Sequence, residues 1–208
     1  MQAVAHTPPI QTPSRIFTPL RPERGTRHRF DADEFSFEGK GNGRRGILYN
    51  VSGNSHPVLY SRHGNLIDAS PYMEAIDQLP GGAGWHGYLD VELMGSPRTP
   101  GVGDGSIMII DLPCVAAPYK ERHAMIRDQV DCFVEPGPDG KWPKVFRPVA
   151  VHCPTGADVL WDTLKGANAR LGHDIWEGIV GKRKTSMNPF SYDWGTRTSQ
   201  DWFKERFL

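Results

Sequence analysis

A single lysine stands between glycines, with two arginines close behind it, in the segment 38–46, Glu-Gly-Lys-Gly-Asn-Gly-Arg-Arg-Gly. Glycines let the phosphates of a nucleotide approach the backbone closely, so a lysine held there is well placed for chemistry on phosphorus. An amine attacks phosphorus only when it is deprotonated, and neighbouring cations favour the neutral form. Lys40 is therefore the candidate nucleophile, although the same pattern also fits a basic β-turn.

Two carboxylates on one strand could bind a metal ion, and two basic residues near the end of the chain could bind a phosphate. In the segment 89–93, alternation places Asp90 and Glu92 on one face of a strand, where they could bind Mg²⁺ or a ribose hydroxyl. An ordinary half-buried strand would show the same pattern. Near the end of the chain, Lys204 and Arg206 also share a strand face, so both could point at one phosphate.

Short strands, with fewer helices between them, must position these residues. Alternating apolar residues between turn signals predict strands over residues 35–40, 45–50, 57–62, 87–94, 107–112, 144–151, 178–182 and 202–207. Because strands outnumber helices and occur in consecutive runs, we expect an α+β fold with antiparallel sheets and a cleft between them. The first three strands should form a meander, with Lys40 at its first turn.

Apolar periodicity and end signals predict three helices that pack against these sheets. The first begins with Ser70 as its N-cap, and the second covers residues 119–130. The third opens at Thr155, with Asp158 as a relative of the capping box, and ends at Gly172.

The composition narrows the class of protein. A chain of 208 residues suits one domain with a real core, and its 24 basic and 24 acidic residues balance. The net charge therefore gives no overall electrostatic attraction to nucleic acid. Binding of nucleic acid would have to come from the local basic clusters at residues 21–29, 40–45 and 181–184. The three cysteines lie far apart, which argues against a disulfide framework or a zinc site and favours a reducing, cytoplasmic setting.

The first 22 residues are rich in proline and threonine, so we expect a flexible arm over residues 1–22 and one domain over residues 23–208. No segment has the apolar length of a signal peptide or of a membrane span. We therefore expect no contact with membranes.

Several segments resemble, in order, the nucleotidyltransferase motifs of the ATP-dependent DNA ligases, a superfamily shared with RNA ligases and mRNA capping enzymes. After Lys40, the best match is Glu-Gly-Ile-Val-Gly-Lys at 177–182, which reproduces the motif Glu-Gly-aliphatic-aliphatic-x-Lys without a gap. The remaining matches are Ser-Arg-His-Gly at 61–64, Asp-Val-Glu at 90–92, Ile-Asp-Leu at 110–112, Tyr-Lys-Glu-Arg at 119–122 and Trp-Phe-Lys-Glu-Arg at 202–206. The resemblance covers roughly residues 35–207.

The resemblance implies a fold and a reaction. The fold would be an ATP-grasp-like nucleotidyltransferase domain with two antiparallel sheets around a nucleotide cleft, here without the C-terminal OB-fold that most relatives carry. In the reaction, Lys40 would attack the α-phosphate of ATP to form a lysine–AMP phosphoramidate. The AMP would then pass to a 5′-phosphate at a nick in duplex DNA, and a 3′-hydroxyl would displace it.

The resemblance also implies roles for individual residues. Lys182 and Lys204 would assist Lys40 in catalysis at the α-phosphate, and Glu177 and Glu92 would bind Mg²⁺. Glu38 would accept a hydrogen bond from the adenine amine, which selects ATP over GTP, although a strand-end charge would also explain it. The residues expected to contact ATP are Glu38, Arg45, Arg62, Glu92, Ile110, Lys182, Lys204 and Arg206. The segment 119–122 is interpreted as structural.

Departures from the motifs leave alternatives open. Asn42 replaces the usual aspartate of the lysine motif, a variation that also occurs in RNA ligases, and Ile110 replaces an aromatic residue that stacks on adenine. Arg62 also fits a solvated strand end. We expect a monomeric DNA ligase that acts on nicked duplex DNA in the cytoplasm, and a viral source acting in a host cell would fit so short a chain. An RNA ligase, a capping guanylyltransferase and a non-catalytic module that binds a nucleotide or a DNA end are the rivals.

Overall fold

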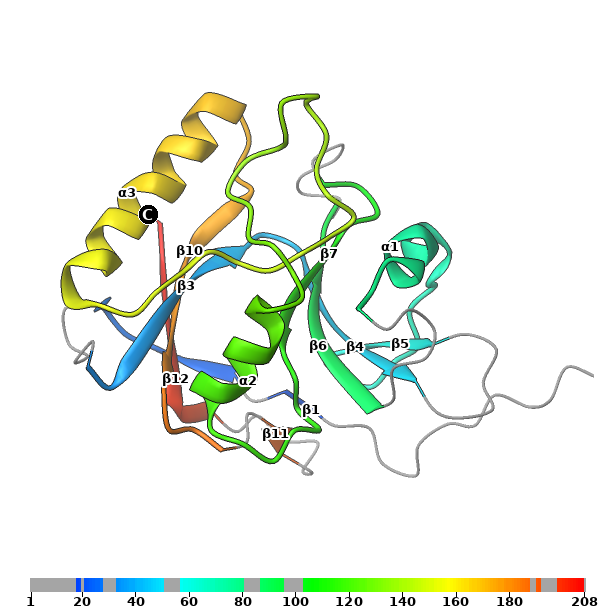
Figure 1. The fold of residues 1–208 in the computed structure, drawn as a ribbon, viewed down its shortest axis with the longest axis horizontal. Helices are drawn as coiled ribbons and strands as arrows, with labels where there is room; N and C mark the ends of the chain where they lie inside the picture. Colours follow the sequence, from blue (N-terminus) through cyan, green and yellow to red (C-terminus); the bar gives the residue numbers. More distant parts are fainter. Residues whose placement is uncertain are drawn as a thin grey trace, which may run out of the picture.

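The computed structural model describes residues 18–19, 21–27, 33–50, 57–80, 87–95, 103–187, 190–191 and 198–207. Two five-stranded sheets lie side by side, with helix α3 against one and helix α1 against the other (Figure 1). The first sheet has the strand order β2-β12-β10-β3-β9 and the second has the order β5-β4-β6-β7-β8, while β1 and β11 form a separate pair. The predicted α+β class is thereby confirmed; the ATP-grasp-like label stays a prediction.

The first sheet and its small neighbour contain the strands β1 (Thr18–Pro19), β2 (Arg21–Arg24), β3 (Phe35–Gly41), β9 (Ala150–Val151), β10 (Trp176–Arg183), β11 (Phe190–Ser191) and β12 (Thr198–Arg206). The second sheet contains β4 (Arg44–Asn50), β5 (Val58–Ser61), β6 (Gly87–Leu93), β7 (Ile107–Asp111) and β8 (Val145–Phe146). Most pairs are antiparallel, as predicted, whereas β2 with β12 and β7 with β8 are parallel.

The predicted three-stranded meander is wrong at its first turn. Strand β4 pairs with β5 as expected, but β3 pairs with β10 and β9 of the other sheet. The backbone N–H of Asn42 donates to the carbonyl of Ile175 at 2.7 Å, which holds the turn against the first sheet. A Cβ on Gly43 would lie 2.5 Å from the carbonyl oxygen of Leu93, so only glycine lets the chain pass the second sheet there. The chain therefore changes sheets directly after Lys40.

The strand predicted over residues 144–151 is two short strands in different sheets. Strand β8 joins the second sheet and β9 joins the first. Pro148 lies between them, and proline cannot donate a backbone hydrogen bond to continue a ladder. The predicted single strand therefore ends before Pro148.

In the described ranges, three α-helices cover the sheets: α1 (Met73–Asp77), preceded by the 3-10 turn η2 (Ser70–Tyr72), α2 (Tyr119–Arg127) and α3 (Pro154–Leu171). Two predicted caps are wrong, because Ser70 bonds to Asp68 and no side chain caps the start of α3 at Cys153. The predicted end of α3 is confirmed, since Gly172 has φ +68°, a conformation that favours glycine.

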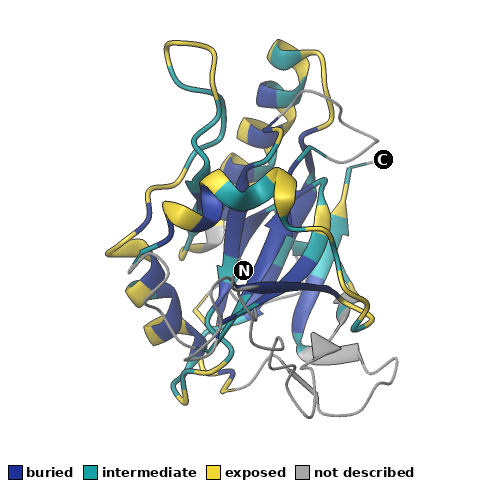
Figure 2. Cartoon of the chain, turned by 90° about the vertical axis from the view of Figure 1, so that its right-hand side faces the viewer, coloured by how far each residue is buried: buried dark blue, intermediate teal, exposed yellow. Residues whose placement is uncertain are grey.

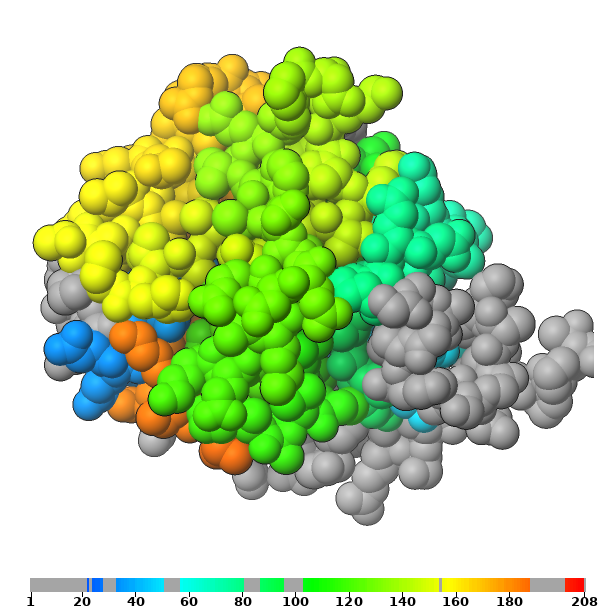
Figure 3. Space-filling view, in the orientation of Figure 1, coloured from blue at the N-terminus to red at the C-terminus, as the bar shows by residue number. Residues whose placement is uncertain are grey.

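The core is divided between the two sheets, as the buried strands in Figure 2 show. One cluster packs α3 residues such as Leu164 against Phe37, Trp176 and Ile179 of the first sheet. The other packs α1 against the second sheet and includes Ile126 of α2. In the space-filling view, α2 and the segment after it lie between α3 and α1 (Figure 3). Met108 and Phe146 of the second sheet also belong to the cluster under α3.

The predicted arm, residues 1–22, lies mostly outside the described residues. Its described part forms β1 and begins β2, which pairs with β12. Just beyond it, the guanidinium of Arg27 lies 4.3 Å from the Trp161 ring centroid and forms an ion pair of 2.8 Å with Glu205. The segment around residues 21–27 is therefore held against the first sheet and α3.

Candidate active site

Lys40 lies at the end of β3, where three strands of the first sheet meet. The register places Lys40 opposite Gly178 of β10, and Gly178 opposite Arg206 of β12. Lys40 Nζ lies 2.6 Å from Oε2 of Glu177, and the Arg206 guanidinium lies 3.1 Å from the same oxygen. Glu177 thus holds the lysine amine and the guanidinium at one carboxylate oxygen.

A β-bulge turns Glu177 toward Lys40. Trp176 and Ile179 both pack in the core under α3, although strict alternation would place them on opposite faces. The register shifts between Trp176 and Gly178, so an extra residue stands opposite Lys40 and the carboxylate faces the amine. Gly178 has φ +147°, and a Cβ there would lie 2.0 Å from the carbonyl oxygen of Glu205. Glycine is therefore required at this position.

Lys204 lies two residues before Arg206 on β12, opposite Val180. Burial lowers the pKa of Lys204 below its ordinary value, and the charges of Arg206, Lys40, Arg24 and Arg62 lower it further. These cations therefore lie close enough to act on one another. Such a cluster favours binding of a phosphate, which would neutralise it.

Glu92 of β6, in the second sheet, lies near enough to Lys40 for the charge of the lysine to act on its carboxyl group. Burial raises its pKa to about 7, while the charges of Lys40 and Arg45 oppose that rise. Arg45 forms two hydrogen bonds with the buried carboxylate of Asp90, of 2.9 and 2.6 Å. Asp90 thus hydrogen-bonds Arg45, and the negative charge of Glu92 raises the pKa of the same arginine, as expected for two carboxylates on one strand face.

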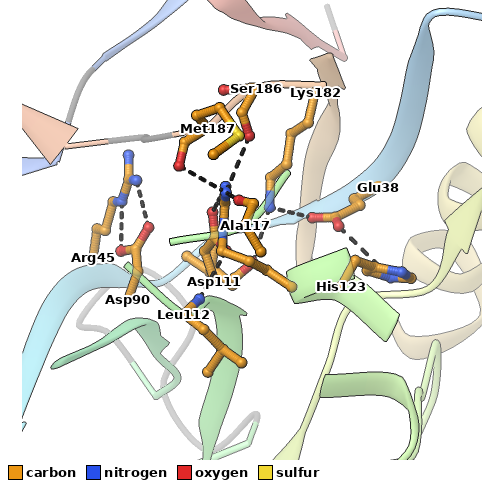
Figure 4. A network of polar contacts seen from close by, with 12 residues as sticks. Glu38, Arg45, Asp90, Asp111, Leu112, Ala117, His123, Lys182, Ser186 and Met187 are labelled. Carbon is orange, nitrogen blue, oxygen red and sulfur yellow. Dashed lines mark hydrogen bonds and ion pairs between the residues drawn. The ribbon is translucent and has the colours of Figure 1, made fainter. Parts of the chain in front are cut away.

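Lys182 does not lie beside Lys40 but pairs with Glu38. The Lys182 ammonium lies 2.6 Å from Glu38 Oε2 and donates to the carbonyl of Ile110 at 2.9 Å (Figure 4). It also lies 4.4 Å from the ring centroid of Trp202 and 4.9 Å from that of Tyr119. Burial raises the pKa of Glu38, and Lys182 opposes that shift. Aromatic faces and a carboxylate thus stabilise a charge that has almost no access to water.

Arg62 and Ile110, which were also expected to contact ATP, make no direct contact with Lys40 or Glu177 among the interactions described above. Arg62 is exposed in the turn after β5, where its Nε donates to His63 Nε2 at 3.0 Å. Ile110 is half-buried on β7 and packs against the cluster under α3. Their expected roles with a nucleotide stay predictions.

Arg122 is the structural residue that the segment 119–122 was expected to supply. Its guanidinium makes two hydrogen bonds to Asp111, of 2.8 and 2.9 Å, and both side chains are fully buried. It also donates to the carbonyls of Ser186 and Met187, at 3.0 and 3.1 Å, so it ties α2 to the loop after β10 (Figure 4). A buried ion pair needs such additional bonds to offset desolvation.

Sequence reasoning missed His123 and gave Trp202 only as part of a motif. His123 lies on α2 with its Nε2 3.9 Å from Glu38 Oε1. Burial lowers its pKa to about 3, and the charge of Lys182 adds to that shift, so the ring is neutral. Nothing in the local sequence distinguishes His123 from an ordinary helix residue, because its neighbour Glu38 lies 85 positions away along the chain.

The carboxylates of Glu177 and Glu92 fit a magnesium ion only if other ligands join them. Within the described ranges, no group of three or more histidine, cysteine, aspartate or glutamate residues could hold a metal ion. Mg²⁺ commonly binds one or two carboxylates together with phosphate oxygens and water. Glu177, which pairs with Lys40, and Glu92, which senses the charge of Lys40, could supply the two carboxylate ligands of such a magnesium site.

No described helix is both long and apolar enough to cross a lipid bilayer.

The fold matches those of solved DNA and RNA ligases. A mycobacterial DNA ligase D complexed with ATP and MES matches over 91% of this chain and 60% of its own, with a TM-score of 0.61 and 17% identity. The ligase domain of M. tuberculosis LigD matches over 91% and 59%, with a TM-score of 0.62 and 18% identity. An archaeal ATP-dependent RNA ligase matches over 89% and 47%, with a TM-score of 0.55 and 17% identity.

At these identities the likeness concerns the fold. The chain spans about 60% of the length of the two DNA ligase structures. No protein-family model matches the sequence, and no curated protein matches it significantly. The chain thus shares its fold with these solved ligases.

Proposed function

We propose that this chain is an ATP-dependent DNA ligase that seals nicks in duplex DNA through a covalent lysine–AMP intermediate. The observation that carries the proposal is the contact of Lys40 and Arg206 with one oxygen of Glu177, beside Lys204 and opposite Glu92. This arrangement provides a nucleophile, cations for a phosphate and carboxylates for a metal ion within a fold that ATP-dependent ligases share. Phosphoryl transfer needs these groups and little else.

Lys40 is the nucleophile in this proposal. Its amine forms a bond to the α-phosphorus of ATP, the bond to the β-phosphate oxygen breaks, and pyrophosphate leaves with the electron pair. Glu177, 2.6 Å from Nζ, orients the amine and is in position to accept its proton. Lys204 and Arg206 balance the charge that develops on the phosphate oxygens.

Glu177 and Glu92 would hold Mg²⁺ together with the phosphates of ATP. A magnesium ion held there would neutralise phosphate charge. The two glutamates come from different sheets, Glu92 from β6 and Glu177 from β10.

Glu38 would contact the adenine amine, and Lys182 would contact the α-phosphate. Lys182 binds Oε2 of Glu38 at 2.6 Å, whereas Oε1 has no hydrogen-bond partner among the described residues. Oε1 could therefore accept from the adenine amine while the ion pair stays closed.

Covalent labelling tests the adenylyl transfer. Incubation with [α-³²P]ATP and Mg²⁺ should label the protein, and Lys40→Ala should abolish the label while leaving the melting temperature unchanged. Transfer of the label to nicked duplex DNA, followed by sealing, tests the substrate. A wild-type protein that carries neither label nor AMP by mass spectrometry would instead be a nucleotide-binding or DNA-end-binding module.

An RNA ligase is the second candidate. Asn42 stands where DNA ligases usually carry aspartate, and archaeal RNA ligases are among the similar structures. Asn42 donates from its side chain to the carbonyl of Asp174 at 2.8 Å, a contact that a carboxylate could not make. Parallel incubations with nicked DNA and nicked RNA of one sequence decide between the two substrates.

A further inference from the structure

Two buried polar atoms face each other without a hydrogen-bond partner beside Lys182. Oε1 of Glu38 and Nε2 of His123 lie 3.9 Å apart, too far for a direct hydrogen bond. Their side chains are 3% and 7% exposed, and neither atom has a hydrogen-bond partner within the described part of the chain. The dashed line between Glu38 and His123 in Figure 4 marks the 3.9 Å separation. Buried polar atoms without partners are costly, so this gap is suited to a third group.

The chemistry of the two atoms defines that group. Glu38 Oε1 is an acceptor when the carboxylate is charged by its ion pair with Lys182. The His123 ring is neutral, because burial and the charge of Lys182 lower its pKa to about 3, so Nε2 accepts when the ring proton is on Nδ1. An NH₂ nitrogen at roughly 2.9 Å from both atoms could donate one N–H to each. Water can fill the same place in the absence of a ligand.

We propose that His123 is a specificity-determining residue, which accepts the second N–H of the adenine 6-amino group while Glu38 accepts the first. This inference rests on the proposed use of ATP and adds to it a residue from α2. Guanine presents a carbonyl oxygen at the same position, and that oxygen would face two acceptors. His123 and Glu38 together therefore exclude guanine more strongly than Glu38 could alone.

The experiment compares two nucleotides that differ only in the amine. Equilibrium affinities for ATP and for purine riboside triphosphate, which has hydrogen in place of the 6-amino group, are measured by calorimetry in the Lys40→Ala background. The preference for ATP should fall about 5- to 10-fold in His123→Leu, the effect of one hydrogen bond. His123→Gln, which keeps an acceptor, should retain part of that preference. His173→Leu, at an exposed histidine after α3, is the matched control and should change nothing.

An unchanged preference for ATP in His123→Leu would overturn the inference. If that variant does not fold, N6-methyl-ATP tests the same point in the protein with His123 intact. Two acceptors require both N–H groups, so a single methyl group should weaken binding at least about 5-fold; equal binding of ATP and N6-methyl-ATP would overturn the inference. Covalent labelling of the wild type by ATP distinguishes failure of this inference from failure of the proposed function. If the wild type is labelled but His123→Leu keeps the full preference for ATP, only the role of His123 is wrong.

Discussion

Glu38 and Lys182 form an ion pair of 2.6 Å with side chains that are 3% and 1% exposed. One residue comes from β3 and the other from the neighbouring strand β10. The pair lies at the inner face of the first sheet and reaches the second sheet through the carbonyl of Ile110. A charge pair so deeply buried affects both the stability and the binding properties of the protein.

Removing one member of this pair should destabilise the protein strongly. Lys182→Met leaves the Glu38 carboxylate buried without its partner, so the free energy of unfolding should fall by about 3–5 kcal/mol. The double variant Glu38→Gln/Lys182→Met should lose less than the sum of the single variants, because it buries no lone charge. Urea denaturation checks this. Asp128→Asn, in an exposed ion pair with Arg127, is the control and should stay within about 0.5 kcal/mol.

Loss of the Glu177 charge should affect catalysis more than stability. Glu177→Gln keeps the size of the side chain but weakens its hold on Lys40 and Arg206, so the rate of labelling by ATP should fall about 100-fold or more. Single-turnover labelling measures that rate. Glu135→Gln, which removes an exposed partner of Arg170, should label at the wild-type rate. A Glu177→Gln protein that labels normally would remove Glu177 from the mechanism.

Glu92 should make stability fall as the pH rises toward neutrality. Burial raises its pKa from the ordinary 4.5 to about 7, so the folded protein keeps a proton that the unfolded chain has released between these values. Stability then decreases with pH across that window, by up to about 3 kcal/mol. Denaturation of wild type and Glu92→Gln from pH 4.5 to 8 isolates the effect as a difference. A constant difference across this range would contradict the expected titration.

Gly178→Ala should disrupt the bulge that aims Glu177. A Cβ at Gly178 meets a backbone oxygen at 2.0 Å in addition to the strain of φ +147°, whereas Gly172 has φ +68° and open space around it. Gly172→Ala should therefore cost about 1–2 kcal/mol and leave labelling intact. Gly178→Ala should cost more and abolish labelling, as denaturation and [α-³²P]ATP incubation would show. Equal stability losses in the two variants would argue against a steric requirement at Gly178.

Local patterns predicted most elements but not their partners. The alternation around Phe37 and Ile47 indicated two strands correctly, because it depends on which face is buried. These strands belong to different sheets because the backbone at Gly43 packs closely against Leu93. That contact joins segments about 50 residues apart in the sequence. Pairing between distant segments leaves no local periodic signal.

The candidate site could be predicted as a set of residues but not as a geometry. Lys40 and Glu177 were expected at one nucleotide site, and their side chains lie 2.6 Å apart. Lys182, which was expected to assist Lys40, pairs with Glu38 instead. The bulge that brings Glu177 to the inner face contradicts simple alternation along β10, so only the pair Trp176 and Ile179 could have indicated it. The position of Lys182 between two aromatic rings depends on tertiary packing.

The passage of the chain from β3 to β4 has a mechanical consequence. Only Asn42 and Gly43 separate the end of one strand from the start of the next, and Lys40 lies two residues before that joint. Displacement in a rotation grows with distance from its axis. If the two sheets rotate relative to each other about this connection, the amine of Lys40 moves little, whereas outlying groups such as Arg62 move farther. The nucleophile therefore keeps its position while the groups around it move.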